Sequence, residues 1–192
     1  GRMSVGGKSP LTGGIKEANA GGNPAQDLVK LGYRVIIVKG QPAERDKRYA
    51  VDVTKDGATV KEVPDCKGMW NYALIDHLAQ SYSPNASFIT IGPAGERMMR
   101  GASVACTDQD EVRRPARHAA RGGLGAVMGS KGLKYVSVEA GKAKAKQGVD
   151  KKAFTALCKG SSKTYLEGPQ PMKYGTSPSV DLANMLNTFP YK

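Results

Sequence analysis

The sequence has 192 residues, with 29 Lys and Arg against 17 Asp and Glu, and so a formal net charge of +12 with both histidines neutral. That length suits one domain, or one domain with part of another, and a composition of 40% hydrophobic and 24% charged residues excludes disordered and collagen-like chains. No apolar run approaches the roughly 18–20 residues that span a bilayer, so we expect a soluble protein without a membrane partner.

The first forty residues predict a strand, a loop, a helix and a second strand. Arg2–Val5 is a short strand that leads into a loop rich in glycine and proline. Asn23 and Pro24 begin a helix, with asparagine as its cap and proline in its first turn, and Gly32 ends it. The run Tyr33–Val38 is short, apolar and β-branched, which makes it the clearest strand prediction in the chain.

The rest of the chain predicts strands in groups, separated by single helices. In chain order the elements are a hairpin (Tyr49–Val53 and Ala58–Val63), a helix (Met69–Ser81), two strands (Ser87–Ile91 and Arg100–Cys106), a helix of small residues (Ala119–Met128) and a strand (Tyr135–Glu139). Asp150 then caps a helix through Leu157, and Ser177 begins another through Leu186. This order indicates an α+β fold with antiparallel sheets rather than regular βαβ winding.

The cysteines predict a reducing environment. Cys66, Cys106 and Cys158 are an odd number of cysteines at wide spacing, without a Cys-x-x-Cys pair. Such a pattern is neither a disulfide framework nor a typical metal site. We therefore expect reduced thiols and a cytoplasmic location.

Positive charge is concentrated in residues 113–152, which hold eleven Lys and Arg against Glu139 and Asp150 and so carry +9 of the +12. Such a window predicts either nucleic acid or a compact phosphorylated ligand as the partner. The few aromatics argue against nucleic acid, because only Tyr135 lies in the window. The 24 glycines, above the typical share of about 7%, favour the ligand, since they let backbone N–H groups approach phosphate oxygens. The alternative is a solvated face beside tight packing turns.

The usual nucleotide-binding and catalytic patterns do not occur. Neither glycine-rich turn matches the P-loop or the dinucleotide fingerprint. Asp76 and His77 are adjacent on a predicted helix and point in different directions, which predicts an exposed pair rather than a dyad. We therefore expect no catalytic residue in this chain.

Five motifs in collinear order carry a resemblance to a known family. They are Lys8–Gly13, Ala18–Gly22, Ile91–Glu96, Arg121–Lys131 and Lys173–Thr176. Together they resemble the N-terminal region of tungsten-dependent aldehyde ferredoxin oxidoreductases, and the resemblance covers nearly the whole chain.

The resemblance implies a base of two antiparallel sheets that carries a tungsten, or molybdenum, bis-pterin cofactor with a phosphate-bridging magnesium ion. It assigns one pterin to Arg2, Asn19 and Gly21, and the other to Arg117, His118, Ala120 and Arg121. The backbone carbonyls of Asn19 and His118 would bind the magnesium. The family pattern has alanine at the position of His118, which a carbonyl role tolerates, and glycine at that of Ala120, where a methyl group crowds a closely approaching ligand.

The resemblance also implies the organisation of the whole protein. Residues 1–140 would be a partial tungstopterin-binding domain, and residues 141–192 a linker with the helical start of a second domain. The full protein would oxidise a small aldehyde to a carboxylic acid and pass electrons to ferredoxin. The ligands of its four-iron four-sulfur cluster would lie outside this chain, in the remainder of the enzyme.

Two alternative functions stay open at this point. One is a basic nucleic-acid-binding module built on residues 113–152, and the other is a non-catalytic split subunit of such an oxidoreductase. The first residues also resemble the middle of a strand, which predicts a fragment that is inactive alone. Self-association into a homo-oligomer is equally open.

Overall fold

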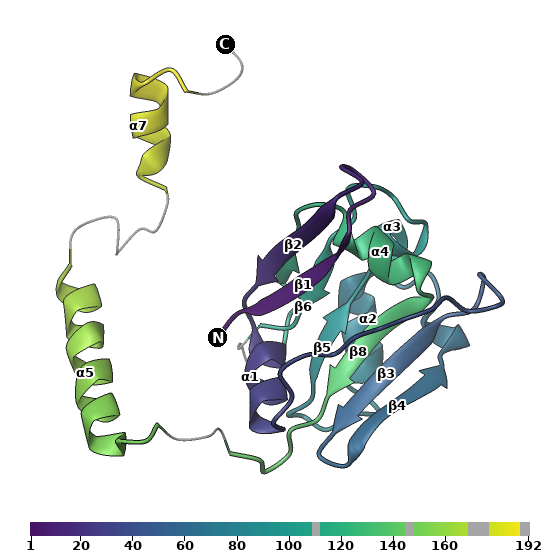
Figure 1. Ribbon diagram of the computed structural model, residues 1–192, viewed down its shortest axis with the longest axis horizontal. Coiled ribbons are helices and arrows are strands. Elements are labelled where there is room, and N and C mark those ends of the chain that lie inside the picture. Colours follow the sequence, from purple (N-terminus) through teal and green to yellow (C-terminus); the bar gives the residue numbers. More distant parts are fainter. Residues whose placement is uncertain (109–111, 145–147, 169–176, 189–192) are drawn as a thin grey trace. The chain divides into compact units, whose positions relative to one another are not determined.

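The structure is a computed structural model that describes residues 1–108, 112–144, 148–168 and 177–188. The chain divides into two compact units, Gly1–Lys146 and Gln147–Lys192 (Figure 1). No helix among the described residues is both long and apolar enough to cross a membrane. The division into domains at residue 140 stays a prediction.

The first unit begins with a two-stranded antiparallel hairpin. Strand β1 (Met3–Lys8) pairs with β2 (Ile15–Ala20), from Met3 opposite Ala20 to Lys8 opposite Ile15. In the turn, Ser9 N donates to Gly14 O at 2.9 Å. The first strand is therefore longer than predicted, because its continuation through the glycines is paired with β2.

The second sheet has six strands in the order β4-β3-β8-β5-β6-β7. Their bounds are β3 Tyr49–Thr54, β4 Gly57–Glu62, β5 Ser87–Thr90, β6 Val104–Cys106, β7 Arg117–Ala119 and β8 Leu133–Val138. Strands β3 and β8 are parallel and the other neighbours antiparallel. The α+β prediction is confirmed, although the larger sheet is mixed rather than purely antiparallel, because the late strand β8 inserts between β3 and β5.

The helices of both units differ from the predictions mainly in length. In the first unit they are α1 Asn23–Lys30, the short 3-10 helix Pro64–Cys66, α2 Asn71–Leu78, α3 Pro93–Glu96 and α4 Leu124–Ser130. The second unit holds α5 Lys151–Glu167 and α7 Ser179–Met185. Asp150 caps α5 as predicted, since its Oδ1 accepts from Ala153 N at 2.9 Å, but the helix runs ten residues beyond Leu157.

The core lies on both faces of the six-stranded sheet, and all six residues of β8 are buried. On one face Tyr135 and Phe88 pack against Leu74 of α2. On the other face Val136 and Ile89 pack in a cluster that includes the inner residues of β2 and the start of α4. The second face therefore carries the hairpin, and with it the residues that the sequence singles out.

The strand predicted over Tyr33–Val38 is wrong. The segment is irregular, and its side chains Val35 and Ile37 are 71% and 72% exposed. Tyr33 and Ile36 pack against the core. The sequence has the right composition for a strand, but strand propensity is realised only where a neighbouring strand satisfies the backbone.

Two helix starts were also misplaced, each for a local reason. Gly22, with φ 101°, is the N-cap of α1, and the side chain of Asn23 instead donates to Asp108 O at 3.1 Å. Helix α4 begins at Leu124 rather than at Ala119, because Ala119 ends β7 and the intervening Gly123 is left-handed at φ 69°. Of the strand predicted over Arg100–Cys106, only Val104–Cys106 pairs.

Candidate functional site

Two segments about a hundred residues apart in the sequence lie side by side in the fold. A Cβ atom on Gly21 would lie 3.9 Å from Cδ of Arg117, and one on Gly122 would lie 2.2 Å from Cγ of Lys16. Residues 16–21 therefore run alongside residues 122–117 in the opposite direction. We call these two segments the β2–β7 strip.

The structure places all seven predicted cofactor residues on this strip or at its end. Arg2 directly precedes Met3, which pairs with Ala20, so it lies at the Gly21 end of the hairpin. Gly21 is half-buried, and the other six are exposed: Arg2, Asn19, Arg117, His118, Ala120 and Arg121. The residues that the resemblance groups together are thus brought together, on an open face of the first unit.

The three arginines of the prediction do not form one cluster. Arg2 and Arg117 lie at the Gly21 end of the strip, whereas Arg121 precedes Gly122 at the Lys16 end. Five residues of extended chain separate these ends by about 17 Å. The strip consequently presents positive charge at two separate places.

Several residues that the sequence did not single out position the strip. Arg117 Nε donates to Asp108 Oδ2 at 2.6 Å, and the imidazole Nδ1 of His118 lies 3.0 Å from Ser103 Oγ. Lys16 lies on the inner face of β2, where its stem packs against Gly122. The alternation of exposed and buried residues in Ile15–Ala20 is the one signal that could have placed Lys16 there.

Ser9 joins the hairpin turn to the turn before α4. Its side chain is buried, donates to Gly122 O at 2.8 Å and accepts from Leu11 N at 3.1 Å. The Lys8–Gly13 motif and the Arg121–Lys131 motif are therefore joined by a hydrogen bond.

Most glycines of the motifs serve packing rather than ligand approach. A Cβ atom would lie 2.2 Å from Thr107 O at Gly22, 2.0 Å from Arg100 O at Gly123, and 1.9 Å from Gly95 O at Gly129. Gly21 differs, because its Cβ would meet only the side chain of Arg117. The glycine excess therefore fits the tight-turn alternative better than the ligand hypothesis, although a few motif glycines, Gly21 among them, have room for a side chain.

The basic window of residues 113–152 is not one continuous surface. Lys134 is fully buried, donates from Nζ to Met69 O at 2.7 Å and pairs with Glu96. Burial lowers the pKa of Lys134, and the Glu96 carboxylate opposes this shift. Tyr135, the one aromatic of the window, is 2% exposed and so cannot stack on a base.

The three cysteines are free, as predicted, and Cys66 and Cys106 are buried. Burial raises the pKa of the Cys106 thiol to about 12, which makes it unreactive near neutral pH. Among the residues that the structure describes, no group of three or more His, Cys, Asp or Glu side chains is placed to hold a metal ion.

The sequence profile described as the N-terminal domain of aldehyde ferredoxin oxidoreductase matches residues 1–140. The chain belongs to the aldehyde ferredoxin oxidoreductase family. Its relatives include the tungsten-containing aldehyde ferredoxin oxidoreductases of Pyrococcus furiosus (32% identity over 200 residues, 100% of this chain and 31% of the relative) and Thermococcus kodakarensis (30% over 198 residues, 99% and 30%). These relatives are enzymes, and the chain spans about a third of their length.

A solved structure extends the family likeness to another reaction. The active-site complex BamBC of benzoyl coenzyme A reductase, in complex with 1,5-dienoyl-CoA, matches 85% of this chain and 23% of its own with a TM-score of 0.74 and 27% identity. This domain therefore resembles part of a protein whose name specifies another substrate. The fifth motif of the resemblance, residues 173–176, lies outside the described residues.

Proposed function

We propose that residues 1–140 form the base on which an oxidoreductase holds a tungsten, or molybdenum, bis-pterin cofactor. The observation that carries the proposal is the β2–β7 strip, which brings Asn19 and Gly21 alongside the segment that bears Arg117 and Arg121, with Arg2 at its Gly21 end, on one exposed face. Family membership and the names of the tungsten-containing relatives support it.

The side chains and open space of the strip fit such an anionic group. Gly21 leaves room for backbone approach, because a Cβ there would touch only the flexible side chain of Arg117. Positive charge at two ends about 17 Å apart suits an elongated ligand with more than one phosphate. Guanidinium groups are the side chains best suited to bind phosphate in a fork geometry.

In this proposal the chain's residues bind, orient and neutralise the cofactor. Arg2, Asn19 and Gly21 hold one pterin, and Arg117, His118, Ala120 and Arg121 hold the other. Asp108 fixes the Arg117 guanidinium, and Ser103 fixes the His118 ring, so neither side chain has to be ordered on binding. The backbone carbonyls of Asn19 and His118 complete the site as ligands of a magnesium ion.

When bound, the metal and its pterins would supply the two-electron redox chemistry, while this domain supplies binding, orientation and electrostatics. We propose oxidation of an aldehyde to a carboxylic acid in the cytoplasm, with ferredoxin as acceptor. A four-iron four-sulfur cluster, with its ligands in the remainder of the enzyme, would carry electrons from the pterin cofactor to ferredoxin. The benzoyl coenzyme A reductase neighbour supports assigning substrate choice to those remaining parts.

The test is metal and pterin analysis of the complete gene product, produced and purified without oxygen. We expect tungsten or molybdenum with pterin in the wild type, and at least a tenfold lower content in the Arg117→Ala, Arg121→Ala double variant. Arg97→Ala, which changes an exposed arginine outside the strip, is the matched control. Wild-type protein with neither metal nor pterin would overturn the proposal.

The division of labour with other chains is tested by the coding sequence. A Cys-x-x-Cys-x-x-x-Cys run downstream of Lys192 in the same gene supports a single-chain enzyme. A separate subunit that carries that run would make this chain the split, non-catalytic partner, with the same role for the strip.

A further inference from the structure

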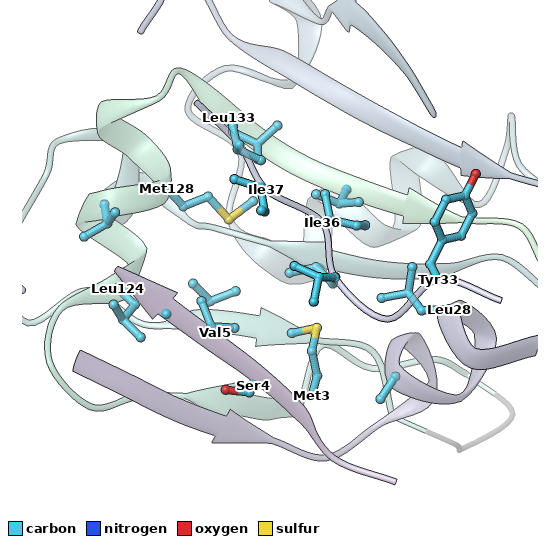
Figure 2. Close-up of a pocket in the computed structure, with 18 of the residues that line it drawn as sticks. Met3, Ser4, Val5, Leu28, Tyr33, Ile36, Ile37, Leu124, Met128 and Leu133 are labelled. Atoms are coloured by element: carbon cyan, nitrogen blue, oxygen red, sulfur yellow. The ribbon is translucent and has the colours of Figure 1, made fainter. Parts of the chain in front are cut away.

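An apolar groove of about 800 Å³ lies beside the hairpin, on the side away from the β2–β7 strip (Figure 2). Strand β1 forms one wall, and the irregular segment 33–38 forms the other. Its floor is the six-stranded sheet with Ile89 and Val136, and Leu124 of α4 closes one end. The groove is therefore lined by the same core cluster that fills the second face of the sheet.

Both walls of the groove have unpaired backbone groups, on the free edge of β1 and along the irregular segment 33–38. Strand β1 pairs with β2 in a sheet of two strands. Along the other wall, Tyr33 N donates to Leu28 O at 2.9 Å, but residues 34–38 have no backbone hydrogen bond to any residue that the structure describes. Unpaired backbone groups beside an apolar hollow are the features that an added strand satisfies.

The exposed side chains on this wall also require a cover. Val35 and Ile37 are 71% and 72% exposed, although both are β-branched and line the groove. Exposed apolar side chains on extended backbone without a hydrogen-bonding partner favour association, and native proteins cover such surfaces. The failed strand prediction has the same explanation, because Tyr33–Val38 has strand composition without a strand partner.

The charges at the groove restrict what can fill it. Its charged lining residues are all basic: Arg34, Lys131 and Arg2, the last of which lies where the end of the hairpin adjoins both the groove and the strip. None of the three forms an ion pair with another described residue. A complementary occupant is apolar in its middle and acidic toward its ends.

We propose that an extended segment of the same protein, from outside residues 1–192, lies in this groove as an additional strand. It exchanges backbone hydrogen bonds with residues 34–38, directs alternate apolar side chains to Ile89 and Val136, and places acidic residues near Arg34 and Lys131. The same chain is the source because the relatives are about three times as long, and a tethered segment binds at high effective concentration. The proposal does not depend on the cofactor.

Photo-crosslinking of the complete gene product identifies the occupant. With p-benzoylphenylalanine in place of Val35, we expect an intramolecular crosslink to a peptide outside residues 1–192 that alternates apolar residues and has acidic flanks. The matched control replaces Val60, which is 68% exposed on β4 at the other end of the sheet, and should not reach that peptide. A crosslink within residues 1–192, to a second copy or to another protein would each overturn the proposal, as would no crosslink.

Hydrogen exchange gives an independent measurement on the unmodified protein. We expect the amides of residues 34–38 to exchange at least about tenfold more slowly in the complete protein than in the 192-residue chain, since a paired strand protects them. Equal rates in the two proteins would overturn the proposal. Neither experiment depends on metal content, so failure here is distinguishable from failure of the cofactor proposal.

Discussion

Lys134 and Arg117 belong to the same basic window, but they lie in different surroundings. Lys134 is fully buried in what we call the α3–α4 corner (Gly95, Glu96, Gly129 and Lys134), where it pairs with Glu96. Arg117 lies on the β2–β7 strip with a side chain that is 57% exposed, 2.6 Å from Asp108. The first cation is enclosed by protein on all sides, whereas solvent or a ligand can reach the second.

Glycines show the same difference between the two regions. At Gly129 in the corner a Cβ would lie 1.9 Å from Gly95 O, whereas at Gly21 on the strip it would make only an ordinary contact at 3.9 Å. Both regions contain cations and glycines, and burial distinguishes the enclosed positions of the corner from the open positions of the strip. Substitutions in the corner should therefore cost more stability than substitutions on the strip.

The largest effect is expected for Lys134→Met. It removes two buried interactions of Lys134, with Glu96 and with Met69 O, although Arg48 and Gly68 N stay beside Glu96, so we expect a loss of about 3–5 kcal/mol in the free energy of unfolding. Urea denaturation measures this loss. Adding Glu96→Gln should not recover this loss, because it leaves the buried Arg48 guanidinium without its carboxylate partner. A loss below about 1 kcal/mol would mean that the corner is not held by this ion pair.

Gly129→Ala is expected to destabilise the protein by about 1–3 kcal/mol, because the added methyl group forces α4 away from Gly95. Gly21→Ala should change stability by less than about 0.5 kcal/mol. Thermal unfolding of the two variants compares corner and strip directly. Gly160→Ala, in open space within α5, is the control and should be neutral or stabilising. Equal losses at Gly129 and Gly21 would remove the distinction between the regions.

Local rules predicted the elements that local interactions determine. The hairpin of Tyr49–Val53 with Ala58–Val63 and the Asp150 cap depend on neighbouring residues, and both were found. Tyr33–Val38 needs a strand partner far away in the sequence, so its strand-like composition led to a wrong prediction. The strip depends on contacts across about a hundred residues, and a family resemblance, rather than periodicity, brought its residues together. The buried state of Lys134 had no local signal, because Glu96 lies 38 residues away.

The side chain of Asp52 is 21% exposed, which is between the exposures of the buried Lys134 and of Arg117. Burial raises the pKa of Asp52, but hydrogen bonds from Lys61, Ser137 and Tyr82 together lower it below its ordinary value. A lowered native pKa contributes stability above the unfolded-state pKa of about 3.9, and this contribution is lost as pH falls through the native value.

Asp52→Asn should therefore cost about 1–2 kcal/mol near neutral pH, as expected for lost hydrogen bonds to a charged group. Stability curves between pH 7 and pH 2 should show the two proteins converging below about pH 4. If the difference in unfolding free energy between the two proteins stayed constant over this pH range, the charge of the carboxylate would contribute nothing to stability. The size of the difference then places Asp52 between the buried pair of the corner and the exposed pair of the strip.

The smallest effect on stability is expected for Arg117→Ala. Its ion pair with Asp108 is mostly exposed, and such pairs contribute less than about 1 kcal/mol and are screened by salt. The loss measured by urea denaturation should thus disappear in 1 M NaCl, whereas the loss for Lys134→Met should persist there, since buried pairs are poorly screened. A salt-insensitive loss at Arg117 would make that arginine part of the fold. If salt instead abolishes the loss, the fold does not depend on Arg117, and the residue remains available to bind an anion.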